Sequence, residues 1–371
     1  MSKGLAGMVV ADTARSRVDG QNGVLLYHGY NILDLGENSS FEAVAYLMWN
    51  SVYPNAAQLA AFKAELAGMR EIPAELMALM KQLPTGGHPV AVLRTMVSML
   101  SLVDGDAENI EVEAAKQKAM RLTAVIPTII AAWQQIRNGK EPVAPRTDLD
   151  HAANFLYMLN GKEGTPEAVA AIGTYLVLLV DHGFNASTFS ARVTTGTLSD
   201  VYSAITTAIG TLKGPSHGGA TQKAMEQFIE AHEMGVEKWF KNALKTGRRI
   251  MGIGHRVYKV EDPRAKIFRP LAAELAKQSD EGYWFDVSLG IEKLARGNKF
   301  FIERNLFPNV DYYSAPVLHM IGIPMDQFTS LFAMSRVVGW TAHVLEQLEN
   351  NRLIRPSAQY VGPEGLEVPK G

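Results

Sequence analysis

From residue 31 onward, apolar residues recur every three or four positions, which is the spacing of one buried face of an α-helix. The pattern, broken by short polar stretches, covers residues 39–50, 55–69, 73–82, 89–103, 109–137, 148–159, 166–180, 185–195, 199–212, 218–232, 236–245, 263–277, 283–297 and 325–350. Ser39 or Ser40 begins the first of these segments and Thr165 directly precedes segment 166–180, where a hydroxyl would cap a helix. The pattern therefore predicts a mainly α-helical fold.

Residues 1–30 follow a different pattern. Short extended stretches are predicted at residues 8–11, 15–18 and 24–27. The last two are joined by Asp19-Gly20 and Asn22-Gly23, pairs that favour tight turns between strands. Because no strand–helix–strand alternation follows, we expect one small N-terminal β element in a mainly α fold.

Composition narrows the class of protein. Of the 371 residues, 47% are hydrophobic and 20% charged, and the net charge of −2 argues against a general nucleic-acid binder. The absence of cysteine excludes disulfides, thiolate metal ligands and cysteine nucleophiles. The longest apolar run, 168–180, is too short to cross a bilayer and is interpreted as a buried helix. Residues 1–7 lack the apolar core of a signal peptide, so we expect a cytoplasmic protein without membrane association.

The stretch 247–264 is a candidate anion-binding loop. Gly252 and Gly254 precede His255, and glycines there let backbone N–H groups approach a ligand closely. The nearby cations are Arg248, Arg249, Arg256, Lys259 and Arg264. A solvated basic loop between two helices is the alternative interpretation.

Two further histidines lie at predicted helix ends. His182 follows the apolar run; a histidine there is usually a satisfied core residue, but the nearby Asn185 favours a site. His217 stands between Gly214-Pro215 and two glycines, at the start of a predicted helix. The glycines would let a substrate approach, and a helix N-terminus favours developing negative charge. An ordinary loop histidine is the alternative.

Three charged residues complete the candidates. Asp311 lies between Val310 and two tyrosines, which suits a base of raised pKa; the alternative is an N-cap of the next helical turn. Arg336 lies on the flank of the apolar stripe of helix 325–350, so it needs either an anionic ligand or a structural salt bridge. Arg355 follows that helix near the C-terminus, where an arginine is usually exposed.

Neither a zinc site nor a dinucleotide-binding loop is indicated. His182, His217 and His255 are 35 and 38 positions apart, without a metal-ligand spacing. The pair Gly252 and Gly254 lacks the third glycine of a dinucleotide loop and follows a basic helix end instead of a buried strand. No metal is therefore expected.

Taken together, these segments resemble the citrate synthase family over almost the whole chain. Its two histidine motifs are similar to residues 214–220 and 252–264, and its aspartate motif to residues 308–314. Its helix arginine and its C-terminal arginine are similar to residues 334–336 and 354–356. All five motifs occur in the family's order.

The resemblance implies an all-α homodimer of the short type. A large domain would be formed by residues 1–218 and 323–371, and a small domain, residues 219–322, would close over the substrates. The implied reaction condenses acetyl-CoA with oxaloacetate and hydrolyses the thioester to give citrate and CoA. Acetyl-CoA is a substrate in this reaction, and no cofactor is implied.

The resemblance also gives each candidate residue a role. Asp311 would be the base that enolises the acetyl group, His217 the donor to the enolate oxygen, and His255 the acid at the oxaloacetate carbonyl. The dianion would be bound by His182, Arg264, Arg336 and Arg355, the last from the partner subunit. The CoA-binding residues would be Ile250, Met251, Gly252, Ile253, Gly254 and Lys259.

Two alternatives stay open. 2-Methylcitrate synthase, which condenses propionyl-CoA, shares the motifs, and one extra methylene in an apolar pocket changes preference by only about 1–3 kcal/mol. A non-catalytic CoA- or anion-binding protein that retained the loop is the alternative from another functional class.

Overall fold

The computed structural model describes residues 3–5 and 7–369 of the chain. Two predictions rest partly on residues outside this described part: the absence of a signal peptide in residues 1–7, and the two ends of the expected large domain. Within the described residues the mainly α prediction is confirmed: the chain forms 17 α-helices and one small sheet. None of the described helices is both long and apolar enough to cross a membrane.

The sheet is the predicted N-terminal β element. It consists of three antiparallel strands in the order β1 (Ser16–Asp19), β2 (Val24–Tyr27) and β3 (Tyr30–Asn31). Asp19 pairs with Val24, so the predicted turn residues lie between β1 and β2. The prediction of a strand at residues 8–11 is wrong, since these residues form no strand. They do not belong to the sheet, in which β2 is the strand paired with β1.

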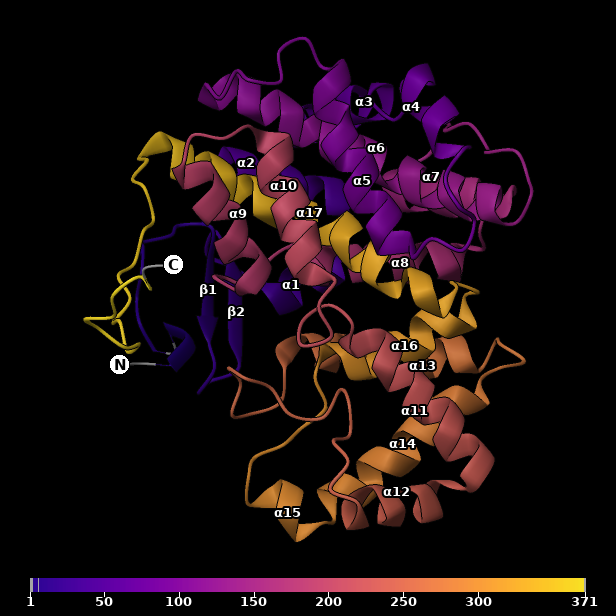
Figure 1. The fold of residues 1–371 in the computed structure, drawn as a ribbon. Coiled ribbons are helices and arrows are strands. Elements are labelled where there is room, and N and C mark those ends of the chain that lie inside the picture. The colour runs from indigo at the N-terminus through magenta and orange to yellow at the C-terminus, as the bar shows by residue number, and fades with distance from the viewer. Residues whose placement is uncertain (1–2, 6, 370–371) are drawn as a thin grey trace.

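Two groups of helices stack in Figure 1, and the chain passes once from the first to the second and back. The upper group contains α1 (Ile32–Asn38), α2 (Phe41–Asn50), α3 (Ala56–Gly68), α4 (Ala74–Met80), α5 (Pro89–Val103), α6 (Val112–Arg137), α7 (His151–Asn160), α8 (Pro166–Leu179), α9 (Ala186–Gly196), α10 (Val201–Leu212) and α17 (Phe328–Glu349). The lower group contains α11 (Ala220–Met234), α12 (Val236–Lys245), α13 (Pro263–Ala276), α14 (Tyr283–Arg296), α15 (Lys299–Ile302) and α16 (Val310–Met320). Short 3₁₀ turns lie at Lys3–Leu5 and Met325–Gln327.

Helix α17 is the centre of the upper group. It packs against α2, α5, α6, α8, α9 and α10, and nearly every residue from Phe328 to Leu345 is buried. A helix that is buried on all sides must carry mostly apolar residues, and any polar side chain on it needs a partner inside the protein. Arg336 and His343 are two such residues, with exposed fractions of 1% and 0%.

The predicted helix starts are confirmed: of the two candidates Ser39 and Ser40 the structure uses Ser40, and both Ser40 and Thr165 accept a hydrogen bond from the backbone N–H three residues later. Three helices were not predicted. Helix α1 has only seven residues and contains Gly36, α15 has only four residues, and α16 contains Pro316. Glycine and proline both weaken the helical signal in a sequence, although the surrounding structure accommodates them here.

Two helix glycines provide a test of how closely α17 approaches its neighbours. A Cβ atom at Gly339 would lie 2.2 Å from the carbonyl oxygen of Val180, whereas one at Gly173 of α8 would meet no atom within 4 Å. We expect Gly339→Ala to lower the free energy of unfolding by about 1–3 kcal/mol through overpacking. Gly173→Ala should raise it by up to about 1 kcal/mol, because alanine favours a helix. Urea unfolding followed by circular dichroism measures both, and changes of the same sign would contradict the close approach.

Candidate active site

His182 and His255 meet at the junction of the two helix groups. His182 lies just after α8, and its Nε2 atom is 3.1 Å from the hydroxyl of Tyr258. The ring centres of His182 and His255 are 5.3 Å apart. Burial lowers the pKa of His182 well below its ordinary value, and the nearby Arg264 and His255 contribute. His182 is therefore neutral near pH 7, and it would contact a ligand by a hydrogen bond and not as a cation.

The loop before His255 is tied to the segment that precedes Asp311. The N–H of Gly254 donates to Phe307 O at 2.7 Å, and the N–H of Asn309 donates to Gly252 O at 2.8 Å. Gly252 and Gly254 have φ angles of 77° and 94°, which favour glycine, and a Cβ at Gly252 would lie 2.8 Å from the backbone of Tyr312. These contacts hold His255 and Asp311 in a fixed relation.

The tautomer of His255 follows from its backbone contacts. Its Nδ1 atom accepts hydrogen bonds from the N–H groups of Val257 and Tyr258, at 3.0 and 3.1 Å. Burial, with Arg264 close by, lowers the pKa of His255 to about 4. The ring is therefore neutral near pH 7 and carries its proton on Nε2, which is available to donate to a ligand.

His217 is held by a chain of polar contacts from α9 and α17. Its Nε2 atom lies 2.8 Å from the hydroxyl of Ser187, which also accepts a hydrogen bond from Trp340 Nε1 at 3.0 Å. Burial, with Arg336 nearby, lowers the pKa of His217 to about 4. His217 stands just before α11, whose first turn has no side-chain cap. The free N–H groups of that turn add positive potential beside the ring.

Asp311 lies in the first turn of α16. The N-cap of that helix is Asn309, whose side chain accepts the N–H of Asp311, so the capping role considered for Asp311 is not the one it has. Thr221 Oγ1 donates to Asp311 Oδ1 at 2.6 Å. Burial raises the pKa of Asp311 above its ordinary value, although Thr221 and Arg264 act in the opposite direction. A carboxylate of raised pKa in this environment suits a general base.

Two buried arginines supply positive charge. Arg264 donates from Nε and Nη2 to both oxygens of Asp262, at 3.0 and 2.8 Å, which leaves Nη1 for other partners. Arg336 donates from Nε to Leu179 O at 2.7 Å and lies 4.8 Å from the ring of Phe332. Burial lowers the pKa of Arg336, but an arginine stays charged at neutral pH.

The ring of Phe332 lies 4.8 Å from the Arg336 guanidinium and 6.2 Å from the ring of His217. Arg336 also contributes to the pKa shifts of His182, His217 and Asp311, so these residues from four segments lie near one another. The other predicted residues lie differently. Ile250 and Ile253 are buried and Met251 is partly buried, whereas Lys259 is exposed and its backbone N–H donates to Gly20 O at 2.8 Å. Arg355 is exposed on the C-terminal segment. Among the described residues, no cluster of three or more His, Asp or Glu side chains could hold a metal ion.

The family profile described as the citrate synthase C-terminal domain matches residues 4–357. The chain belongs to the citrate synthase family. It is 45% identical to citrate synthase 2 of Bacillus subtilis over 98% of this chain and 96% of that protein. It is also 39% identical to the 2-methylcitrate synthase of Mycobacterium tuberculosis, over 100% of this chain and 92% of the relative.

Solved structures in the citrate synthase family have the same fold. The citrate synthase of Thermoplasma acidophilum, solved as a ternary complex with carboxymethyl coenzyme A and oxaloacetate, superposes with a TM-score of 0.93. Its sequence is 35% identical, and the alignment covers 100% of this chain and 98% of that one. The recognition of the family and the all-helical fold are thus confirmed.

Four polar residues around the site were missed in the sequence: Ser187, Thr221, Tyr258 and Trp340. Ser187 and Thr221 follow His182 and His217 by five and four positions, so each begins the helix next to a candidate histidine. Their place at a helix start beside a candidate histidine was the signal in the sequence that could have identified these two residues. The partner that each side chain contacts lies 30 or more positions away and could not be read from spacing.

Removing the Thr221 hydroxyl tests the environment of Asp311. Because its hydrogen bond favours the ionised carboxylate, Thr221→Val should raise the pKa of Asp311 further. A base must be deprotonated to act, so the acid limb of kcat/KM in a citrate synthase assay should move to higher pH. The exposed Thr246, changed to Val, is the matched control and should leave the profile unchanged. If the acid limb of kcat/KM stays at the same pH in Thr221→Val, then Asp311 is not the group whose titration produces that limb.

Proposed function

We propose that this chain is a citrate synthase that condenses acetyl-CoA with oxaloacetate and releases citrate and CoA. The observation that carries this proposal is the single site formed by Asp311, His217 and His255 with two buried arginines. Full-length similarity to citrate synthases supports it. Enolisation and condensation are assigned to side chains below, and water hydrolyses the resulting thioester to release CoA, so the proposal requires no metal or redox cofactor.

Enolisation of the acetyl group is assigned to Asp311 and His217. Asp311 would remove a methyl proton while His217 donates a hydrogen bond to the thioester oxygen. The Ser187 hydroxyl has two acceptors within reach of its one proton: Asn185 Oδ1 at 2.7 Å, which also accepts the N–H groups of Ser187 and Thr188, and His217 Nε2 at 2.8 Å. In the proposed reaction this proton is directed to His217 Nε2. This places the histidine proton on Nδ1. A neutral donor fixed in this way stabilises the enolate without adding a proton to the base.

Condensation is assigned to His255 and the cationic side chains. The Nε2–H of His255 would polarise the ketone carbonyl of oxaloacetate and protonate the new alkoxide. The two carboxylates would be bound by Arg264, Arg336 and His182. Arg264 and Arg336 are only 3% and 1% exposed. Arg264 is already paired with Asp262, whereas the buried charge of Arg336 favours an anionic ligand.

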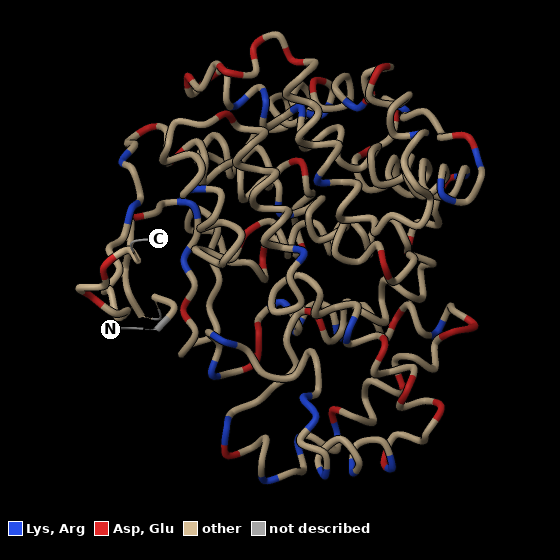
Figure 2. Tube along the Cα trace, in the orientation of Figure 1, with Lys and Arg blue, Asp and Glu red and all other residues tan. Residues whose placement is uncertain are grey.

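Domain closure and CoA binding complete the proposal. Residues 219–322 would form the small domain and close against 1–218 and 323–371, with oxaloacetate held by Arg264 on one side and Arg336 on the other. CoA would contact Ile250–Gly254 and Lys259. The small domain carries Lys and Arg positions along its outer edge, including α12 and the segment after it, which suits a ligand with phosphate groups (Figure 2).

Thiol release with purified protein tests the reaction. With oxaloacetate present we expect turnover of acetyl-CoA to exceed that of propionyl-CoA; the reverse order would favour a 2-methylcitrate synthase, as the mycobacterial relative suggests. Asp311→Asn should retain oxaloacetate binding and lose roughly 10²–10⁴-fold in turnover of either thioester. Asp286→Asn, a change of the same kind on α14, should be unaffected. Folded protein without turnover of either thioester would refute an enzymatic function.

We also propose a homodimer in which Arg355 serves the partner's site. The segment before it is anchored to the end of α9, where Asn351 Nδ2 donates to Gly196 O at 3.4 Å and Ile354 packs near Gly196. The other end of α9 carries Ser187, the contact of His217. Eleven helical residues span about 16 Å, which is more than an arginine side chain can reach back. Arg355 is thus better placed to extend away from its own subunit.

Subunit mixing separates a shared site from an independent one. Arg355→Ala and His255→Ala dimers should each be nearly inactive. If the two are refolded together in equal amounts, about half of the dimers are hybrids, and each hybrid has one intact site only if Arg355 acts across the interface. Activity should then recover to about a quarter of the wild-type value. No recovery, with hybrids confirmed by differently tagged subunits, would place Arg355 in its own subunit's site.

A further inference from the structure

Three side chains on one face of α17 contact residues 179–187, which run from the last residue of α8 to the first turn of α9. Arg336 donates to Leu179 O at 2.7 Å, and Trp340 donates to Ser187 Oγ at 3.0 Å. His343 Nε2 lies 3.2 Å from Asp181 Oδ2. The three residues are spaced i, i+4 and i+7, which places them along one side of a helix. Arg336 and Trp340 already belong to the site, whereas His343 has no assigned role.

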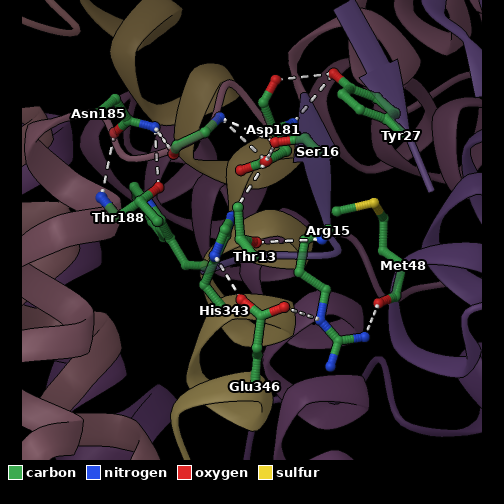
Figure 3. A network of polar contacts seen from close by, with 12 residues as sticks. Thr13, Arg15, Ser16, Tyr27, Met48, Asp181, Asn185, Thr188, His343 and Glu346 are labelled. Carbon is green, nitrogen blue, oxygen red and sulfur yellow. Dashed lines mark hydrogen bonds and ion pairs between the residues drawn. The ribbon is translucent and has the colours of Figure 1, made fainter. Parts of the chain in front are cut away.

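His343 lies at the centre of a buried polar network (Figure 3). On one side is Asp181, and on the other is Glu346, whose Oε2 is 3.6 Å from His343 Nδ1. Arg192 from α9 donates to Glu346 at 2.7 Å and approaches His343 Nδ1 at 3.3 Å. The N-terminal segment completes the network, since the N–H of Ala14 donates to Glu346 at 2.9 Å. Burial lowers the pKa of His343, but the carboxylates of Asp181 and then Glu346 outweigh it and raise the pKa.

Asp181 fixes the backbone on both sides of His182. Its Oδ2 accepts the N–H of Gly183 at 3.2 Å and a hydrogen bond from the Ser16 hydroxyl. The hydroxyl of Tyr27 donates to the carbonyl of Asp181 at 2.9 Å. Burial would raise the pKa of Asp181, but His343, Arg336 and Ser16 hold it below its ordinary value. The carboxylate is thus ionised and fully buried, and its residue directly precedes His182 in the chain.

Stability alone does not account for these charges. Burying an ion pair removes both groups from water, and a well-packed apolar pair of similar size is often at least as stable. What the polar network adds is a fixed geometry, since Asp181 Oδ2 is held at once by Ser16, Gly183 and His343. Gly339 of α17 faces Val180 and Asp181, and its lack of a side chain lets the two elements approach closely enough for these bonds to form.

We propose that His343 is a positioning residue for the oxaloacetate site: it holds the Asp181 carboxylate, and Asp181 in turn holds the backbone that presents His182. The role rests on the proposed function, because His182 is a ligand of oxaloacetate only in that function. His343 acts from behind the site and contacts no substrate. Its removal should therefore weaken oxaloacetate binding selectively, while the acyl-CoA site, built largely from the lower helix group, keeps its affinity.

Substitutions at His343 test the proposal through the two substrates. His343→Leu leaves Asp181 without this donor, and we expect the KM and Kd for oxaloacetate to rise about 10–100-fold, as for other residues that orient a ligand. The amide of His343→Gln can still donate to Asp181, so that variant should recover most of the loss and retain an increase of only about threefold to tenfold. The KM for acetyl-CoA should change less than twofold in both.

The matched control is His151→Gln, which alters another fully buried histidine in the upper group, stacked on Phe41 of α2. It should leave both KM values unchanged. Calorimetry with oxaloacetate and the melting temperature accompany each assay. The proposal would be overturned if affinity fell equally for both substrates. It would also be overturned if His343→Gln bound oxaloacetate as tightly as the His151→Gln control does. This second comparison can be made even if His343→Leu does not fold. Wild-type protein that neither binds oxaloacetate nor turns over would instead refute the proposed function.

Discussion

The site depends on one packing contact, which joins α17 to residues 179–187 between the end of α8 and the start of α9. At Gly339 the helix comes so close to the backbone of Val180 that any larger residue would overlap it. The arginine, indole and imidazole groups nearby are donors that are shielded from water, so each must find an acceptor inside the protein. The segment supplies those acceptors, and His182 and Ser187 are thereby held in register with Arg336.

The same burial determines the chemistry of the titrating groups. Burial, and then the nearby arginines, lower the pKa of His182, His217 and His255, so all three rings are neutral where an exposed histidine would begin to titrate. The opposite applies to Asp311, whose carboxylate is less stable in this environment than in water. A base of raised pKa together with neutral donors is the combination that enolisation at a thioester requires.

Much of the fold could be read from local pattern. The long helices, the N-caps at Ser40 and Thr165, and the turn between β1 and β2 follow from spacing and from residue preferences that act within a few positions. Helix α16 was missed because Pro316 interrupts the pattern. That helix forms against α11, α13 and α14, so its stability comes from packing partners far away in the sequence.

The sequence by itself determined the helical class, the family, and which residue types carry the candidate chemistry, because motifs and periodicity are local properties of the chain. Only the tertiary structure decided how those residues act. It assigned the cap of α16 to Asn309 instead of Asp311, paired Arg264 with Asp262, and brought Ser187 to His217 and His343 to Asp181. Protonation and hydrogen-bond direction depend on burial and on neighbours that are distant in the chain, and these exist only once the helices have packed.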